Sequence, residues 1–159
     1  MQLFGLSLFI ALIVAADQFT KYLTVANIAL YEDVPFLPGL LQLTYIQNTG
    51  AAFSSFEGQQ GLFALIFVVF TGLILWEYRK NNMKFTRLEW WCIAAIYGGG
   101  VGNMIDRLRL GYVVDMIEVE FITFPVFNVA DCFITCGAIL LMIHLVFWNR
   151  NFWKDEKAA

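Results

Sequence analysis

The sequence predicts an all-α membrane protein of four transmembrane helices, with a small β-sheet on the outer membrane surface and both termini in the cytoplasm. Of its 159 residues, 60% are hydrophobic and 14% are charged, whereas soluble domains are about half apolar and about a quarter charged. Four apolar stretches approach the roughly 20 residues that a spanning helix needs. Because backbone polar groups within lipid must be paired internally, these stretches are predicted to be helices.

We expect a single integral-membrane domain over residues 1–159, with helices at roughly 3–23, 59–78, 88–107 and 130–149. The first stretch is not interpreted as a cleaved signal peptide, because no basic segment precedes it and no small-residue cleavage site ends it. Three consecutive glycines, residues 98–100, fall within the third helix. They favour close helix packing over a ligand-binding role.

Basic residues predict the orientation of the chain. The connection between the second and third helices, residues 78–87, carries four positive charges and no acid. The C-terminal tail adds Arg150, Lys154 and Lys157. By the positive-inside rule both segments are cytoplasmic, and all five Trp lie near these same helix ends, as an aromatic belt would.

The segments predicted to lie outside are residues 24–58 and 108–129. Residues 40–46 are rich in β-forming side chains and follow turn-forming Pro and Gly residues, which is typical of a strand. The second outer segment contains the β-forming runs 113–114 and 119–124. We expect the two segments to pair as a small sheet on the membrane surface.

Polar side chains are scarce, and they gather near the predicted outer ends of the helices. A charge at the bilayer centre costs at least about 2.5–3.5 kcal/mol, so ionisable groups close to lipid point to function. The simpler alternative is that they cap helices and anchor the headgroup boundary. The residues concerned are Asp17, Lys21, Asn48, Asn103, Asp106, Arg107, Asp115, Asn128 and Asp131.

Taken singly, several of these residues have a structural explanation. Asn103 and Asp106 are three apart and share a helix face, so with Arg107 they favour a polar network that ends the helix. Asp115 has apolar neighbours that would raise the pKa of its carboxyl, but an exposed turn acid fits its position equally well. Asp131 also fits an acid in the first turn of a helix, where the helix dipole favours negative charge.

Taken together, Asp115 and Asp131 predict a chemistry. Both are expected at the same depth, and two carboxyl groups held close together cannot both ionise. One can then act as a base toward water while the other polarises a peptide carbonyl and helps the amine leave. Asn48, Asn128 or Arg107 could orient the pair or bind substrate.

Competing chemistries find less support in the sequence. The only histidine, His144, falls toward the cytoplasmic end of the fourth helix, which excludes a Ser-His or Cys-His pair at the outer face. Cys92, Cys132 and Cys136 lie in apolar runs and are interpreted as small buried hydrophobes. No metal-ligand cluster and no basic nucleic-acid-binding stripe is visible, so no metal, cofactor or nucleic acid is predicted.

Four motifs, in order, give the chain a specific resemblance. They are residues 17–21 (DQFTK), 47–54 (QNTGAAFS), 102–107 (GNMIDR) followed by 111–115 (GYVVD), and 127–131 (FNVAD). Along nearly its whole length the sequence resembles the bacterial lipoprotein signal peptidases, also called signal peptidase II. Met116 stands where Phe is common in that family, a departure expected to alter packing and not chemistry.

The resemblance implies an aspartyl endopeptidase whose catalytic pair matches Asp115 and Asp131. Its substrate would be a diacylglyceryl-modified prolipoprotein, cut just before the lipidated cysteine. Residues 40–56 would form a β-cradle over the membrane. The supporting and substrate-binding positions would be Asn48, Asn103, Arg107, Asn128, Asp17, Lys21 and Asp106.

The resemblance also implies a location and partners. The chain would be a multi-pass protein of the bacterial cytoplasmic (inner) membrane, monomeric, in contact with membrane lipid, with its active site near the extracytoplasmic face. The peptide antibiotic globomycin would block its cleft.

Two other classes of function fit the sequence less well. A small cation or proton transporter would place its acids at mid-membrane depth and show an inverted repeat, and neither is visible here. A non-enzymatic scaffold would account for the helices but not for four polar motifs that converge on one face.

Overall fold

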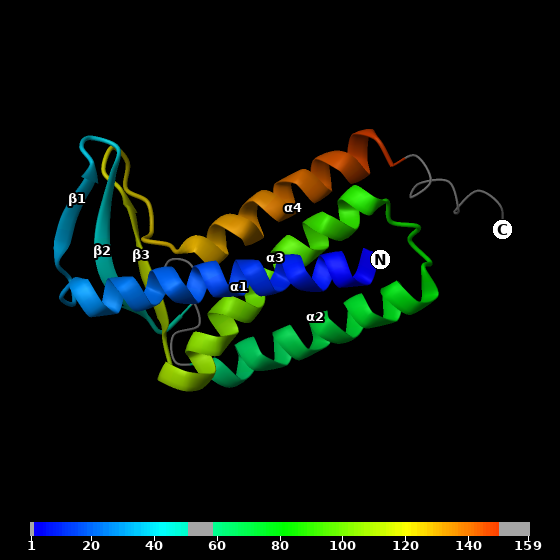
Figure 1. The fold of residues 1–159 in the computed structure, drawn as a ribbon, viewed down its shortest axis with the longest axis horizontal. Helices are drawn as coiled ribbons and strands as arrows, with labels where there is room; N and C mark the ends of the chain where they lie inside the picture. The colour runs from blue at the N-terminus through cyan, green and yellow to red at the C-terminus, as the bar shows by residue number, and fades with distance from the viewer. Residues whose placement is uncertain (1, 51–58, 150–159) are drawn as a thin grey trace.

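The computed structural model describes residues 2–50 and 59–149 of the chain. Within them, four helices run lengthwise beside one another, and a small sheet lies across one end (Figure 1). Each helix overlaps one of the four stretches predicted from the sequence. The helices are α1 (Gln2–Asn27), α2 (Gln60–Lys80), α3 (Arg87–Leu110) and α4 (Val129–Phe147).

Three of the helices, α1, α2 and α4, are long and apolar enough to cross a membrane. Large apolar side chains such as Leu65, Val68 and Leu140 are exposed on them, which suits a surface that faces lipid. The structure therefore supports a membrane protein.

Helix α3 is more polar, because it carries Glu89, Asp106 and three arginines near its ends. It contacts α1, α2 and α4, so much of its surface faces protein. Its 24 residues rise about 36 Å, which is long enough to cross a bilayer. That it crosses together with the other three stays a prediction.

Glycines allow α3 to lie close to its neighbours. A side-chain Cβ at Gly99 would collide with the backbone oxygen of Ala130 at the start of α4, and one at Gly98 would lie 3.2 Å from Ile13 of α1. At Gly102 it would meet the carboxyl group of Asp17. The prediction that residues 98–100 serve close helix packing is confirmed.

The sheet is antiparallel, in the order β1-β2-β3, with β1 at Asp33–Leu37, β2 at Leu41–Asn48 and β3 at Val113–Val119. Strand β2 pairs with β3 from Leu41 opposite Val119 to Asn48 opposite Val113. The predicted pairing of the two outer segments is thus confirmed. Of the predicted β-cradle, residues 51–56 lie outside the described part of the chain.

The predicted strand at 119–124 is wrong, since β3 ends at Val119. Beyond it the chain turns back until Phe127 lies beside Ile117, and these two residues exchange backbone hydrogen bonds of 3.0 and 2.8 Å. The returning segment therefore pairs with β3 through a single β-bridge, and α4 begins two residues after Phe127.

The sheet lies at one end of the helices, and the first turn of α1, the α2–α3 connection and the last turn of α4 lie at the other (Figure 1). This arrangement is compatible with the predicted orientation. Which end is cytoplasmic stays a prediction, and the basic tail on which it partly depends lies outside the described residues.

Candidate active site

The first turn of α4 places Asp131. Asn128 is the N-cap, and its side-chain Oδ1 accepts a 3.0 Å hydrogen bond from the backbone N–H of Asp131. In return, the backbone N–H of Asn128 donates to Asp131 Oδ2 at 3.2 Å. The pattern Asn-x-x-Asp thus forms a capping box that fixes both side chains at the helix start.

Strand β3 places Asp115, whose side chain is buried with only 2% of its surface exposed. The Asn48 amide at the end of β2 donates to Asp115 Oδ2 at 2.8 Å, and the Asn128 amide donates to Asp115 Oδ1 at 2.6 Å. The alternative of an exposed turn acid is therefore wrong for Asp115.

Asn103, in the middle of the site on α3, joins the two acids. Its Nδ2 donates to Asp131 Oδ1 at 2.8 Å, and its Oδ1 accepts from Asn128 Nδ2 at 3.1 Å. Since Asn128 also contacts Asp115, two asparagine side chains connect the carboxyl groups of Asp115 and Asp131. Segments more than 60 residues apart in the chain meet here.

Burial raises the pKa of the Asp115 carboxyl to about 6. The hydrogen bond from Asn48 stabilises the charged form and opposes this rise, whereas the nearby charge of Asp131 adds to it. The Asn128 amide acts in the same sense as Asn48. Asp115 can therefore hold or release a proton near neutral pH.

A buried lysine anchors the surroundings of the pair. Lys21 Nζ lies 2.9 Å from Asp17 Oδ2, 2.9 Å from Asp106 Oδ2 and 2.8 Å from Asn103 Oδ1. Asp17, Lys21 and Asp106 are each no more than 3% exposed. The cation compensates two carboxylates that would otherwise be costly to bury.

The two carboxylates that bind Lys21 also hold the backbone just before each member of the pair. Asp106 Oδ2 accepts the backbone N–H of Val114 at 3.1 Å, one residue before Asp115. Asp17 Oδ1 accepts the backbone N–H of Ala130 at 3.0 Å, one residue before Asp131. Lys21 thus connects the supports of both acids.

Gln18 belongs to the same network and was not singled out from the sequence. Its Nε2 donates to Asp106 Oδ1 at 2.9 Å and to the backbone oxygen of Gly102 at 3.2 Å. The sequence does contain one indication of this role. Gln18 directly follows Asp17 in a mostly apolar helix, where an amide side chain needs hydrogen-bond partners.

Arg107 hydrogen-bonds backbone carbonyl groups beside the site. Its guanidinium donates to the backbone oxygens of Gly50 at 3.0 Å and Asn103 at 3.4 Å, and it lies 4.4 Å from the centre of the Phe63 ring. The sequence left open whether Arg107 orients the acid pair or binds substrate, and in the structure these hydrogen bonds go to carbonyl groups. Arg107 therefore holds the turn after β2.

A cavity of about 1140 Å³ borders both acids. It extends between the turn after β2, helices α2, α3 and α4, and the segment before α4, and Asn48, Asn103 and Arg107 also line it. Away from the acids its walls are mainly apolar, with Phe63, Phe67 and Phe70 of α2 among them. The space thus combines a polar end with an apolar channel.

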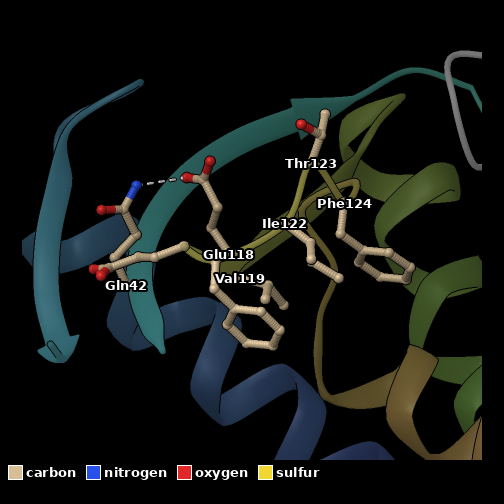
Figure 2. A pocket seen from close by; sticks show the side chains of 8 residues that line it. Gln42, Glu118, Val119, Ile122, Thr123 and Phe124 are labelled. Atoms are coloured by element: carbon tan, nitrogen blue, oxygen red, sulfur yellow. Dashed lines mark hydrogen bonds between the residues drawn. The ribbon is translucent and has the colours of Figure 1, made fainter. Parts of the chain in front are cut away.

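A second pocket, of about 480 Å³, lies on the sheet and contains none of the predicted site residues. Figure 2 shows its lining, where the Gln42 amide donates to Glu118 at 2.9 Å beside Ile122 and Phe124. Both acids of this pocket already have partners, because Thr44 also donates to Glu118 at 2.8 Å and the backbone N–H of Gly39 donates to Glu120 at 2.6 Å.

His144 and the three cysteines lie in different surroundings. His144 contacts Glu89 at 2.8 Å, in the half of α4 far from Asp131. The three cysteines are free, and their interpretation as buried hydrophobes holds for Cys92, while Cys132 is half-buried and Cys136 exposed. Both of the latter line the large cavity.

Comparison with known proteins shows the family of this chain. Residues 9–147 match the profile of peptidase family A8, described as Signal peptidase (SPase) II. The chain belongs to the signal peptidase II family. It is therefore a membrane protein of a peptidase family, as its sequence resemblance implied.

Relatives and solved structures agree with this assignment. The chain is 45% identical over 155 residues to the lipoprotein signal peptidase of Streptococcus pyogenes serotype M1, covering 98% of this chain and 95% of the relative. It is 44% identical over 151 residues to that of Enterococcus faecalis, covering 94% and 88%. A bacterial membrane enzyme solved at 2.3 Å resolution superposes with a TM-score of 0.83 at 29% identity, covering 92% of this chain and 90% of the other.

Proposed function

We propose that this signal peptidase II is an intramembrane aspartyl endopeptidase that removes the signal peptide from diacylglyceryl-modified prolipoproteins, cutting just before the lipidated cysteine. The observation that carries the proposal is the arrangement of Asp115 and Asp131. Both bind Asn128, both are linked through Asn103, and both border one cavity.

The pair supplies the acid and the base that peptide hydrolysis needs. One carboxylate takes a proton from water, whose oxygen bonds to the carbonyl carbon of the scissile peptide. The other carboxyl hydrogen-bonds the carbonyl oxygen and stabilises its developing charge. Proton transfer to the amide nitrogen then lets the carbon–nitrogen bond break. The raised pKa of Asp115, about 6, suits a pair that keeps one shared proton at neutral pH.

The neighbouring side chains have separate roles in this proposal. Asn48 and Asn128 orient Asp115, and Asn103 orients Asp131. Arg107 holds the turn that closes one side of the cavity. The buried group of Asp17, Lys21 and Asp106 fixes the backbone before each acid and does not touch the substrate.

The shape of the cavity fits a substrate that arrives from the bilayer. Its apolar walls on α2, α3 and α4 can accept the apolar part of a lipidated signal peptide, while its polar end meets the scissile bond. We propose that the polar end lies near the extracytoplasmic face of the bacterial cytoplasmic (inner) membrane, with both termini on the other side. The enzyme acts as a monomer, and globomycin occupies the same cavity.

A gel-shift assay on a diacylated precursor tests the proposal. Asp115→Asn and Asp131→Asn should each slow cleavage by about 10²–10⁴-fold, the usual contribution of acid–base catalysis. Glu118→Gln is the matched control, because Glu118 lies on the same strand but binds Gln42 and Thr44 instead. Wild-type cleavage by either asparagine variant, with the protein correctly inserted, would remove the pair from the mechanism.

A further inference from the structure

Gln60, the first residue of α2, makes contacts that the proposed mechanism has not used. Its Nε2 donates to the backbone oxygen of Gly111 at 2.7 Å and to that of Thr49 at 3.2 Å. Carbonyl oxygens only accept hydrogen bonds, so the amide nitrogen, not the amide oxygen, must face them. The two N–H groups of one side chain are thus both directed at backbone.

The two carbonyls belong to segments that reach Asp115 from different sides. Thr49 directly follows Asn48, whose amide donates to Asp115 Oδ2 at 2.8 Å. Gly111 is the C-cap of α3, with a left-handed φ of 81°, and β3 with Asp115 begins two residues later. One glutamine side chain therefore joins the segment that holds the Asn48 donor to the segment that holds its acceptor.

Two further hydrogen bonds support the turn after β2. Asn48 Oδ1 accepts the backbone N–H of Gly50 at 3.0 Å, and Arg107 donates to the backbone oxygen of Gly50 at 3.0 Å. Arg107 thus holds the far side of the turn, while Gln60 holds its middle residue. A partly buried backbone carbonyl such as that of Thr49 needs a donor, so replacing Gln60 with an apolar residue would remove this donor from Thr49 and break its link to the exposed Gly111.

We propose that Gln60 is a positioning residue for the reaction, which sets the alignment of the Asn48 amide on Asp115 by joining Thr49 to Gly111. The proposal rests on the proposed role of Asp115 in catalysis. It makes Gln60 part of the same chain of contacts as Arg107, although its side chain touches neither acid.

The consequence extends to the titration of Asp115. The Asn48 hydrogen bond lowers the pKa of Asp115 against the effect of burial, so a misaligned amide lets that pKa rise. The charged groups that face Asp115 are Asp131 on α4, Lys21 on α1 and Arg107 on α3. The described contacts of Gln60 involve none of these charges, so its substitution leaves all of them in place.

The test compares Gln60→Met with Gln59→Met in the full-length purified enzyme, with a diacylated precursor as substrate. Gln59 is the adjacent glutamine, is exposed, and makes no side-chain capping hydrogen bond to α2. For Gln60→Met we expect kcat to fall about three- to tenfold, as the loss of a hydrogen bond would cause, with KM unchanged. The limb of the pH–rate profile that reports the pKa of Asp115 should shift to higher pH by about half a pH unit. Gln59→Met should behave as wild type.

A second variant, Gln60→Glu, places acceptor oxygens against two carbonyl oxygens, and its kcat should fall further than that of Gln60→Met. A wild-type kcat in both Gln60 variants would overturn the proposal. So would a lower kcat with an unmoved pH profile and a lowered melting temperature, which would show a purely structural role. Failure of the aspartyl mechanism itself would appear separately, as full activity of Asp115→Asn.

Discussion

Helices α3 and α4 begin with the same capping box, and the two boxes differ in what surrounds them. In α3, Thr86 accepts the backbone N–H of Glu89 at 3.3 Å, and Glu89 accepts the backbone N–H of Thr86 at 2.6 Å. In α4, Asn128 and Asp131 make the equivalent bonds at 3.0 and 3.2 Å. The local chemistry of the helix start is therefore shared.

The two capping boxes differ in the further contacts that their acids make. Glu89 is fully buried, and its oxygens also bind His144 and Asn149 at 2.8 Å each. The acid of this box is enclosed by hydrogen-bond partners and does not line the large cavity. The Glu89 box therefore fastens the last turn of α4 to the first turn of α3.

The Asn128 box differs because its cap is an amide. An amide has donors left after it caps the helix, and Asn128 uses them on Asp115 at 2.6 Å and on Asn103 at 3.1 Å. A threonine cap has no such nitrogen. The comparison teaches that a second carboxyl group and an adjoining cavity, rather than the capping box, make this helix start a candidate active site.

The largest expected effect on stability concerns the support beneath the Asn128 box. Lys21→Met removes the cation that binds both Asp17 and Asp106, which leaves buried acids uncompensated and should destabilise the protein by about 3–5 kcal/mol. Unfolding in detergent measures it, and exposed Lys80→Met is the control. Equal stability of the two variants would show that Lys21 is not the anchor described here.

Asn128→Ser should separate capping from catalysis. Serine is also a good N-cap, so the start of α4 should persist, but the donors to Asp115 and Asn103 are lost. A hydrogen bond to a charged group is worth about 1.5–3 kcal/mol, which corresponds to a drop in kcat of about 10–150-fold. Single-turnover cleavage and melting temperature should be measured together. Unchanged cleavage would mean that capping alone explains Asn128.

The pH dependence of stability should report Asp115. Its folded pKa lies near 6, above the ordinary aspartate value of 3.8, so between these values the folded state binds more protons than the unfolded state. Stability is then favoured at low pH and is lost as pH rises through 6, by up to about 1.4 kcal/mol per pH unit. The difference in unfolding free energy between wild type and Asp115→Asn, measured from pH 4 to 8, should show this slope. A flat difference would contradict the burial described for Asp115.

The smallest expected effect concerns the structural box. Thr86→Ala should cost about 1 kcal/mol of stability through loss of the cap and leave cleavage of a diacylated precursor unchanged. The reason is that neither Thr86 nor Glu89 lines the large cavity. A loss of kcat in a variant that melts within a few degrees of wild type would show that the two ends of α3 are coupled.

Much of the fold followed from local pattern. The apolar stretches marked the helices because lipid requires continuous apolar surface, and β-forming runs bounded by turn residues marked β2 and the start of β3. The predicted strand at 119–124 failed because a long-range contact, the bridge between Ile117 and Phe127, reverses the chain there. The β-propensity of residues 119–124 does not show that the chain reverses there.

The sequence predicted which residues form the candidate site, but not how their side chains contact one another. The motifs placed Asp115 and Asp131 at one depth, but the dual use of Asn128 as cap and donor depends on α4 starting beside β3. Gln18 and Gln60 were missed because an amide among apolar residues signals only that it needs partners, and the sequence does not show which groups these are. Charge alone left open whether Arg107 orients the acids or binds substrate, and the fold places carbonyl groups beside its guanidinium.

The central claim is that Asp115 and Asp131 act as one catalytic unit. Single-turnover cleavage of a diacylated precursor by Asp115→Asn, Asp131→Asn and the double variant tests it most directly. We predict that each single substitution lowers the rate by about 10²–10⁴-fold and that the double variant is no slower than the worse single, because partners in one step are not additive. A double variant whose loss is the product of the two single losses, or a single variant that cleaves at the wild-type rate, would contradict the account.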